Sequence, residues 1–152
     1  MEAKRINIFP FLRILIGIIF IVSGVEKLMS PYQNFLYVIQ NYDLIGPPWD
    51  EGIARVFPWI ELMLGVFAVL GLWTKWSLRG LMALSSIFIL VVAQAITRNL
   101  PINECGCFGG ALSIPLPAIL LFDGVTWLCL AFMIKRDRTL RFSLDEYFRR
   151  KN

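Results

Sequence analysis

The sequence predicts an all-α membrane protein, a bundle of four transmembrane helices with cytoplasmic termini and a short interfacial helix in the first outer loop. Of its 152 residues, 57% are hydrophobic and only 17% are charged, and the mean hydropathy is +0.65. Soluble domains have about 45–50% apolar and about 25% charged residues. The composition excludes a soluble enzyme. Because the chain has no histidine, it also excludes haem with a histidine ligand and histidine-containing zinc sites.

Four apolar segments are long enough to cross a bilayer, which takes about 20 helical residues. We place these segments at residues 11–28, 56–73, 78–97 and 117–134. The charged residues within the first, second and fourth segments are Arg13, Glu26, Lys27, Glu61 and Asp123. The segments are still interpreted as spans, because the alternative leaves long apolar stretches in water. The first is interpreted as an uncleaved span because no small-residue cleavage site follows it.

The loop between the first two spans, residues 30–55, has an apolar face at helical spacing. The residues of this face are Tyr32, Phe35, Leu36, Val38, Ile39 and Tyr42. A helix here would end before Gly46-Pro47-Pro48. It would lie over the mouth of the bundle as a lid, or it would be a plain connector anchored in the membrane interface by its aromatic residues.

The distribution of Lys and Arg predicts the orientation. With the N-terminus inside, twelve of the 15 Lys and Arg residues fall on the inner side, and only Lys27, Arg55 and Arg98 fall outside. Such an excess is typical of cytoplasmic loops. Seven of the twelve lie after residue 134, so we divide the chain into a four-helix domain, 1–134, and a basic amphipathic cytoplasmic tail, 135–152. The tail suits an anionic lipid surface, and no nucleic-acid partner is predicted.

The sharpest motif is Cys105-Gly106-Cys107 in the second outer loop, which is followed closely by Gly109 and Gly110. Cysteines two residues apart can form a disulfide only in a tight turn, for which Gly106 supplies backbone freedom. Such a small ring is strained, and strained disulfides tend to be the labile or catalytic ones. Gly109 and Gly110 would leave the sulfurs accessible to a partner thiol. Redox use and structural pairing both remain open, and no metal is predicted because two thiolates without histidine leave a zinc site half empty.

Polar residues gather in the outer third of the spans. They are Glu26, Lys27, Glu61, Gln94, Arg98 and Asp123. Ionisable residues at this depth normally face the bundle interior and pair. We therefore expect a polar chamber below the cysteines, with Glu61 and Asp123 in one outward-facing cavity within one water of Arg98. The chamber is either a structural clasp or a site that lowers the thiolate pKa, relays protons or binds a polar headgroup such as a quinone ring. Cys129, in the fourth span, is interpreted as a packing residue.

Two stretches resemble the opening of the DoxX-like membrane proteins: SGVEKL at residues 23–28 and the Pro-x-x-Glu-x-x-x-Gly pattern at residues 58–65. The CGCFG motif at residues 105–109, with Asp123 beyond it, is similar to the MauE branch, named for methylamine utilisation. The resemblance implies a multi-pass protein of a prokaryotic cell (inner) membrane. Its implied role is thiol–disulfide handling outside the cytoplasm, alongside a thioredoxin-like protein or a disulfide-containing client.

The layout is also similar to that of the quinone-linked disulfide oxidoreductases and vitamin K epoxide reductase. The leading hypothesis is a thiol–disulfide redox protein in which Cys105 and Cys107 exchange with an extracytoplasmic thioredoxin-like partner. Electrons would pass to a membrane quinone, and no covalently bound cofactor is expected. One alternative is a non-catalytic maturation factor or scaffold with a structural disulfide. Another is a small transporter that uses the buried carboxylates.

The predicted orientation is tested by reporter fusions. Alkaline phosphatase folds only where disulfides form, so a fusion after Gly110 is expected to be active and a fusion after Lys75 inactive. The reverse pattern would place the cysteines in a reducing compartment and remove the basis of the redox hypothesis.

Overall fold

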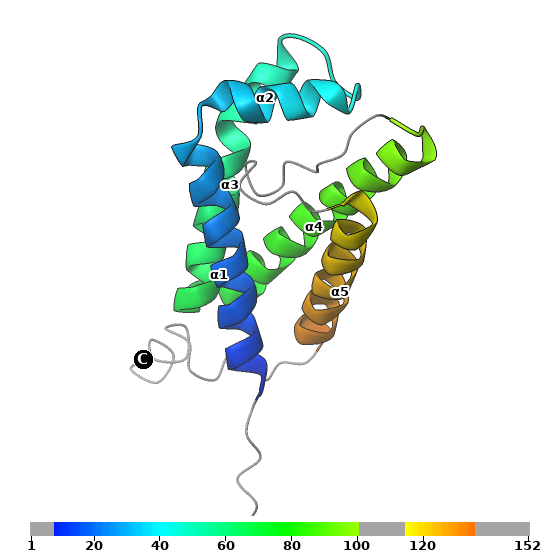
Figure 1. The fold of residues 1–152 in the computed structure, drawn as a ribbon. Coiled ribbons are helices and arrows are strands. Elements are labelled where there is room, and N and C mark those ends of the chain that lie inside the picture. Colours follow the sequence, from blue (N-terminus) through cyan, green and yellow to red (C-terminus); the bar gives the residue numbers. More distant parts are fainter. Residues whose placement is uncertain (1–7, 101–114, 136–152) are drawn as a thin grey trace, which may run out of the picture.

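The computed structural model describes residues 8–100 and 115–135, and these residues form five α-helices (Figure 1). The helices are α1 (Ile8–Met29), α2 (Tyr32–Asn41), α3 (Trp49–Leu70), α4 (Thr74–Thr97) and α5 (Leu116–Lys135). All except α2 are long and apolar enough to cross a membrane. The described part of the chain contains no strand, so the predicted all-α class with four spans and one short helix is confirmed.

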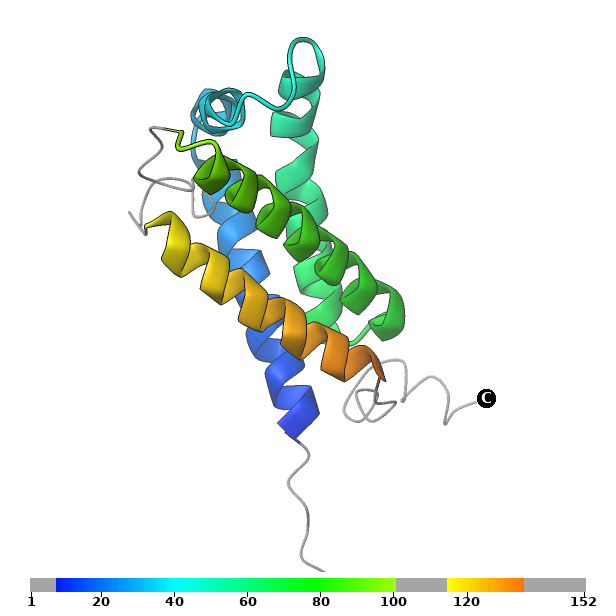
Figure 2. The ribbon, with the colours of Figure 1, turned by 90° about the vertical axis from the view of Figure 1, so that its right-hand side faces the viewer.

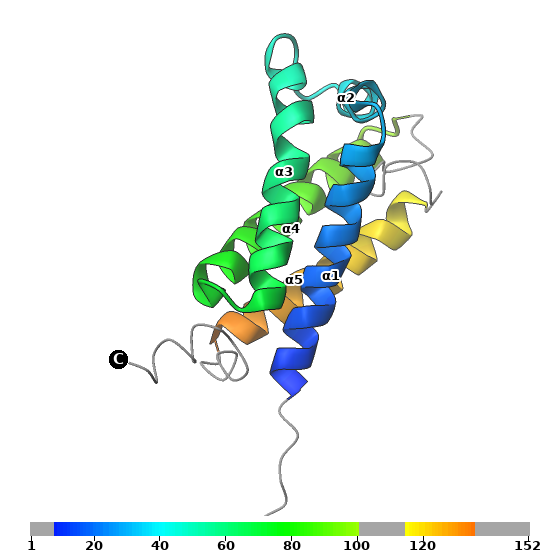
Figure 3. The same ribbon diagram turned by 90° about the vertical axis from the view of Figure 1, so that its left-hand side faces the viewer.

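The long helices associate as two pairs. Helix α1 lies along α3, and α4 lies along α5 at an incline to the first pair (Figures 2 and 3). The short helix α2 lies across one end of the bundle, beside the start of α3 (Figures 1 and 3). The end of α4 and the start of α5 also lie toward this end, and we call it the α2 end.

Glycine brings the backbones of α1 and α3 into contact. A Cβ atom at Gly17 would lie 2.9 Å from the carbonyl oxygen of Gly65, and a Cβ atom at Gly65 would lie 2.9 Å from the carbonyl oxygen of Gly17. Two turns further along α1, a Cβ atom at Gly24 would lie 3.1 Å from the carbonyl oxygen of Pro58. Small residues allow such close approach, and they are typical of helix interfaces in membranes because association there depends on packing.

A tight turn joins α3 to α4. Gly71 adopts the left-handed conformation, with φ at 70°, and its N–H donates to the Phe67 carbonyl at 2.9 Å. Such a glycine is a common helix stop because it has no Cβ to clash. At the other end, α3 begins at Trp49, seven residues before the predicted start of the span. Its first turn contains Asp50 and Glu51, which favour a helix N-terminus but are not apolar.

The core has two parts. The larger cluster includes Ala68, Leu78, Leu81, Leu130 and Met133, each at most 1% exposed, and Cys129 packs against it. The interpretation of Cys129 as a packing residue is confirmed. A smaller cluster at the α2 end combines the chain after α2 with the end of α4 and the start of α5; its buried members are Tyr42, Val92, Ala95, Leu116 and Ile119.

Helix α2 is fastened to the start of α3 by side chains. The Gln40 amide donates to the Asp50 carboxylate at 2.9 Å, and Asp50 is only 1% exposed. The Arg55 guanidinium lies 4.7 Å from the centre of the Tyr32 ring, a cation–π contact. Together these contacts hold α2 in place at the end of the bundle.

The glycine contact predicts an unusual response to alanine. Alanine is the better helix former, yet Gly65→Ala is expected to lower the free energy of unfolding by about 1–3 kcal/mol because its Cβ meets backbone atoms. In the same helix, Gly52→Ala meets nothing within 4 Å and is expected to be neutral or stabilising. Thermal unfolding of both variants in nanodiscs measures the difference. Equal midpoints would contradict the contact.

Candidate functional site

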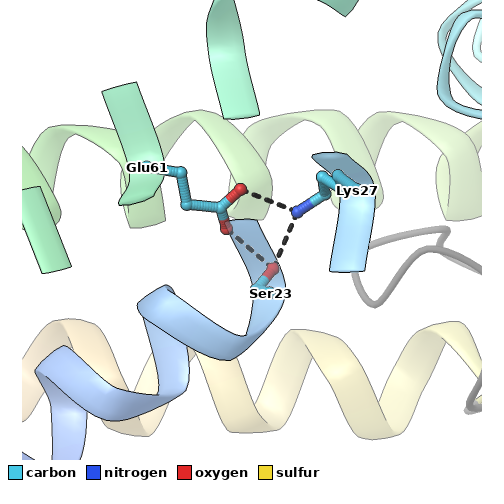
Figure 4. Close-up of polar contacts among 3 residues, drawn as sticks. All are labelled: Ser23, Lys27 and Glu61. Carbon is cyan, nitrogen blue, oxygen red and sulfur yellow. Dashed lines mark hydrogen bonds and ion pairs between the residues drawn. The ribbon is translucent and has the colours of Figure 1, made fainter. Parts of the chain in front are cut away.

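Three buried polar side chains form a closed network between α1 and α3 (Figure 4). The Lys27 ammonium donates to Glu61 Oε2 at 2.8 Å and to Ser23 Oγ at 2.7 Å. The Ser23 hydroxyl donates to the other Glu61 oxygen, Oε1, at 2.8 Å. The side chains of Lys27 and Glu61 are 0% and 1% exposed. Because a buried charge is tolerated only when it is paired and hydrogen-bonded, the three residues depend on one another.

Helical spacing and close backbone approach place this network. Ser23 and Lys27 are four residues apart on α1, so their side chains lie on one face of the helix. Gly24 lies between them and packs against the α3 backbone at Pro58, three residues before Glu61. The lack of a side chain at Gly24 therefore brings α3 close enough for Glu61 to reach both donors.

Aromatic rings complete the surroundings of the Lys27 ammonium. Its nitrogen lies 5.5 Å from the centre of the Phe35 ring, on α2, and 5.4 Å from the centre of the Phe88 ring, on α4. Ring faces carry partial negative charge and attract cations, more strongly where water is excluded. One lysine thus contacts four helices: its own, α2, α3 and α4.

A second carboxylate, Asp123 on α5, faces the network across a small cavity. The cavity has a volume of about 30 Å³, and its polar lining side chains are Ser23, Glu61, Asp123 and Thr126. Asp123 Oδ2 is buried and has no hydrogen-bond partner among the described residues. A cavity of this size has room for at least one water molecule, which needs two or more polar partners. Glu61 and Asp123 therefore line one cavity.

Tyr42 lies just after α2, outside the membrane-spanning helices, and it is close enough to Asp123 to be affected by its charge. The residue is 4% exposed. Burial, together with the negative charge of Asp123, raises the pKa of Tyr42 to about 12. At neutral pH its hydroxyl is therefore neutral and keeps its proton.

Comparison with known proteins decides the family. The model of the family described as methylamine utilisation protein MauE matches residues 6–136, most of the chain. This chain belongs to the MauE family. A curated relative from Paracoccus denitrificans, named methylamine utilization protein MauE, is 24% identical over 123 residues, which cover 81% of this chain. The chain spans 66% of that relative's length, and no solved structure matches it. With its four apolar helices, this MauE chain is a multi-pass membrane protein.

The structure corrects the expected place of Arg98 in the MauE chain. Arg98 was expected within one water of Glu61 and Asp123, but its guanidinium donates to the Asp43 carboxylate at 3.1 Å. The two side chains of this pair are 44% and 79% exposed. The reason is that α4 ends at Thr97, so Arg98 lies beyond the helix, where its long side chain extends to the surface.

Two further members of the expected chamber are Glu26 and Gln94. Glu26 is half-buried next to Lys27 on α1, but the Lys27 ammonium is bonded to Glu61. The amide of Gln94 is buried, and neither its oxygen nor its nitrogen has a hydrogen-bond partner in the part of the chain that the structure describes. The hydrogen bonds and the small cavity bring together Ser23, Lys27, Glu61 and Asp123.

The predictions for Cys105, Gly106, Cys107, Gly109 and Gly110 lie outside the described residues, which stop at residue 100 and resume at 115. The disulfide and its accessibility stay predictions.

Sequence reasoning missed Ser23 as a site residue and Asp43 as the partner of Arg98. A signal existed for Ser23, because a hydroxyl four residues before an intramembrane lysine lies on the same helix face. No comparable signal existed for Asp43, which is 55 residues from Arg98 along the chain.

The buried pair predicts strong coupling between α1 and α3. Lys27→Met leaves Glu61 buried without a cation and is expected to lower the free energy of unfolding by about 3–5 kcal/mol. Glu61→Leu is expected to do the same, and the double variant to recover much of the loss. Thermal unfolding in nanodiscs measures the cycle. Arg98→Gln, which breaks an exposed pair, is the control and is expected to change stability by less than about 1 kcal/mol. Additive single effects would contradict the coupling.

Proposed function

We propose that this MauE protein is a membrane-embedded thiol–disulfide redox protein that takes part in methylamine utilisation. Cys105 and Cys107 exchange with an extracytoplasmic thioredoxin-like protein or a disulfide-containing client. The side of the membrane rests on the Lys and Arg distribution, and the basic segment 135–152 is its cytoplasmic tail. The family name and the name of the relative support the methylamine pathway.

The proposed exchange is balanced as follows. A thiolate of the partner attacks one sulfur of the Cys105–Cys107 disulfide, forms a mixed disulfide and releases the other sulfur as a thiolate. The second thiolate of the partner then attacks the partner's own sulfur in the mixed disulfide, which forms the partner's disulfide and releases the bound cysteine of this chain as a thiolate. The partner leaves as a disulfide, and Cys105 and Cys107 have gained two electrons and two protons. The reverse sequence reduces a partner disulfide.

The observation that carries the proposal is the buried network at the α2 end, with Asp123 across a cavity from Glu61. The cysteine motif lies in sequence between the end of α4 and the start of α5, and both ends lie toward this side of the bundle. Exchange needs a thiolate, so protons must leave and return. In the proposal Asp123, whose Oδ2 is free of hydrogen bonds within the described residues, holds such a proton, and the Lys27 ammonium stays bonded to Glu61.

A quinone as electron acceptor stays a prediction. The described residues do not fit its ring, because the polar cavity of about 30 Å³ is too small for one. The side chains that line the larger cavity, about 350 Å³, are hydrocarbon except for Tyr42, and one hydroxyl cannot donate to both carbonyl oxygens of a quinone. We therefore derive no step through a quinone.

A second candidate function is a non-catalytic maturation factor with a structural disulfide. The pairing within Ser23, Lys27 and Glu61 favours it, because a network whose groups satisfy one another is what a clasp between helices requires.

Redox titration of the purified protein separates the two functions. We expect a reversible two-electron couple above about −250 mV, because a strained, accessible disulfide is easily reduced. Cys105→Ser and Cys107→Ser are expected to abolish the couple without loss of helical content, since so short a ring adds little to stability. Cys129→Ser is the matched control and is expected to titrate like the parent. Loss of helical content or membrane insertion in Cys105→Ser would instead support the maturation factor.

A further inference from the structure

A cavity of about 350 Å³ lies beneath α2 on the far side of the aromatic rings that surround Lys27. Residues of α2, the following loop, α3 and α4 line it, among them Phe35, Val38, Ile53, Phe57, Phe88 and Val91. Its volume falls in the range of small-molecule sites, about 300–1,000 Å³. Neither the redox chemistry nor the polar network uses this cavity.

The cavity opens to the side of the bundle. Three of its lining residues, Leu44, Ile45 and Ile87, are 40–47% exposed, so they form an open rim. Ile87 lies within α4, a membrane-spanning helix, and its neighbour Leu90 is 69% exposed. The apolar lining is therefore continuous with the surface that this helix turns to the lipid.

The chemistry of the lining selects the occupant. Water needs two to four polar partners, which a hydrocarbon lining does not supply. A ring with carbonyl groups would lose hydrogen bonds on entry. A hydrocarbon chain loses nothing, because the bilayer and the lining are equally apolar, and it gains the packing contacts that an unfilled space forfeits.

We propose that this cavity binds one acyl chain of a membrane phospholipid, which enters sideways beneath α2. The chain packs between α2 and α4 against Val38 and Val91, and the headgroup remains at the membrane surface. Phe35 and Phe88 form the wall between the chain and the Lys27 ammonium. The inference does not depend on the proposed redox function, since it involves neither cysteine of the motif.

The test uses the full chain in phosphatidylcholine nanodiscs that contain a trace of phosphatidylcholine with a diazirine in the middle of one acyl chain. After irradiation, peptide mass spectrometry locates the labelled residues. We expect labelling of α2 and α4 residues that line the cavity. Val91→Phe fills part of the space and is expected to reduce that labelling by about tenfold. Leu90→Phe, at the adjacent residue outside the lining, is the matched control and is expected to leave it unchanged.

A second variant, Val38→Phe, fills the same cavity from α2, so the test does not depend on one substitution. Thermal unfolding of all three variants shows whether each keeps its fold. Labelling that is equal in Val91→Phe, Val38→Phe and the parent would overturn the proposal. Labelling that an excess of a tail-less quinone displaces would also overturn it, because the site would then take a ring.

Discussion

The bundle depends on one buried ion pair. Lys27 and Glu61 lie where a lone charge would be prohibitively costly, so each requires the other, and the pair forms only if α1 and α3 are in one register. The glycine contacts make that register possible, because they bring the two backbones together. The sequence features that the pair needs, a serine one turn before the lysine and glycines on the facing side, all belong to the same interface.

The second pair of helices adds what the first lacks. Helices α4 and α5 contribute Leu78, Leu81, Leu130 and Met133 to the larger apolar cluster and, at the α2 end, a ring beside Lys27 and a carboxylate opposite Glu61. The surroundings of the ion pair are therefore completed by helices from both pairs. The α2 end, where the ion pair lies, is also the end from which the cysteine motif of this MauE protein extends in sequence.

Much of this architecture is predictable from the sequence because the bilayer sets both the length of a span and the cost of a charge. The four spans, helix α2 and the membership of Lys27, Glu61 and Asp123 in one polar region follow from those two constraints. Those constraints do not determine which polar side chains pair with one another. Arg98 binds Asp43 and not the chamber because α4 ends one residue earlier, and the end of a helix is decided by contacts distant in sequence. Hydropathy likewise misplaces the start of α3, whose first turn is acidic.

Phe35 and Phe88 each contact two different environments. Both rings lie close to the Lys27 ammonium, and both line the apolar cavity. A displacement of either ring changes the solvation of the Lys27 ammonium and the shape of the apolar space together. The two are therefore thermodynamically linked: any molecule that binds more tightly with a ring moved also shifts the strength of the ion pair, and a change in the ion pair alters the affinity for that molecule by the same factor. If an acyl chain occupies the apolar space as proposed, the two phenylalanines would link the surrounding lipid to the electrostatics of the protein interior.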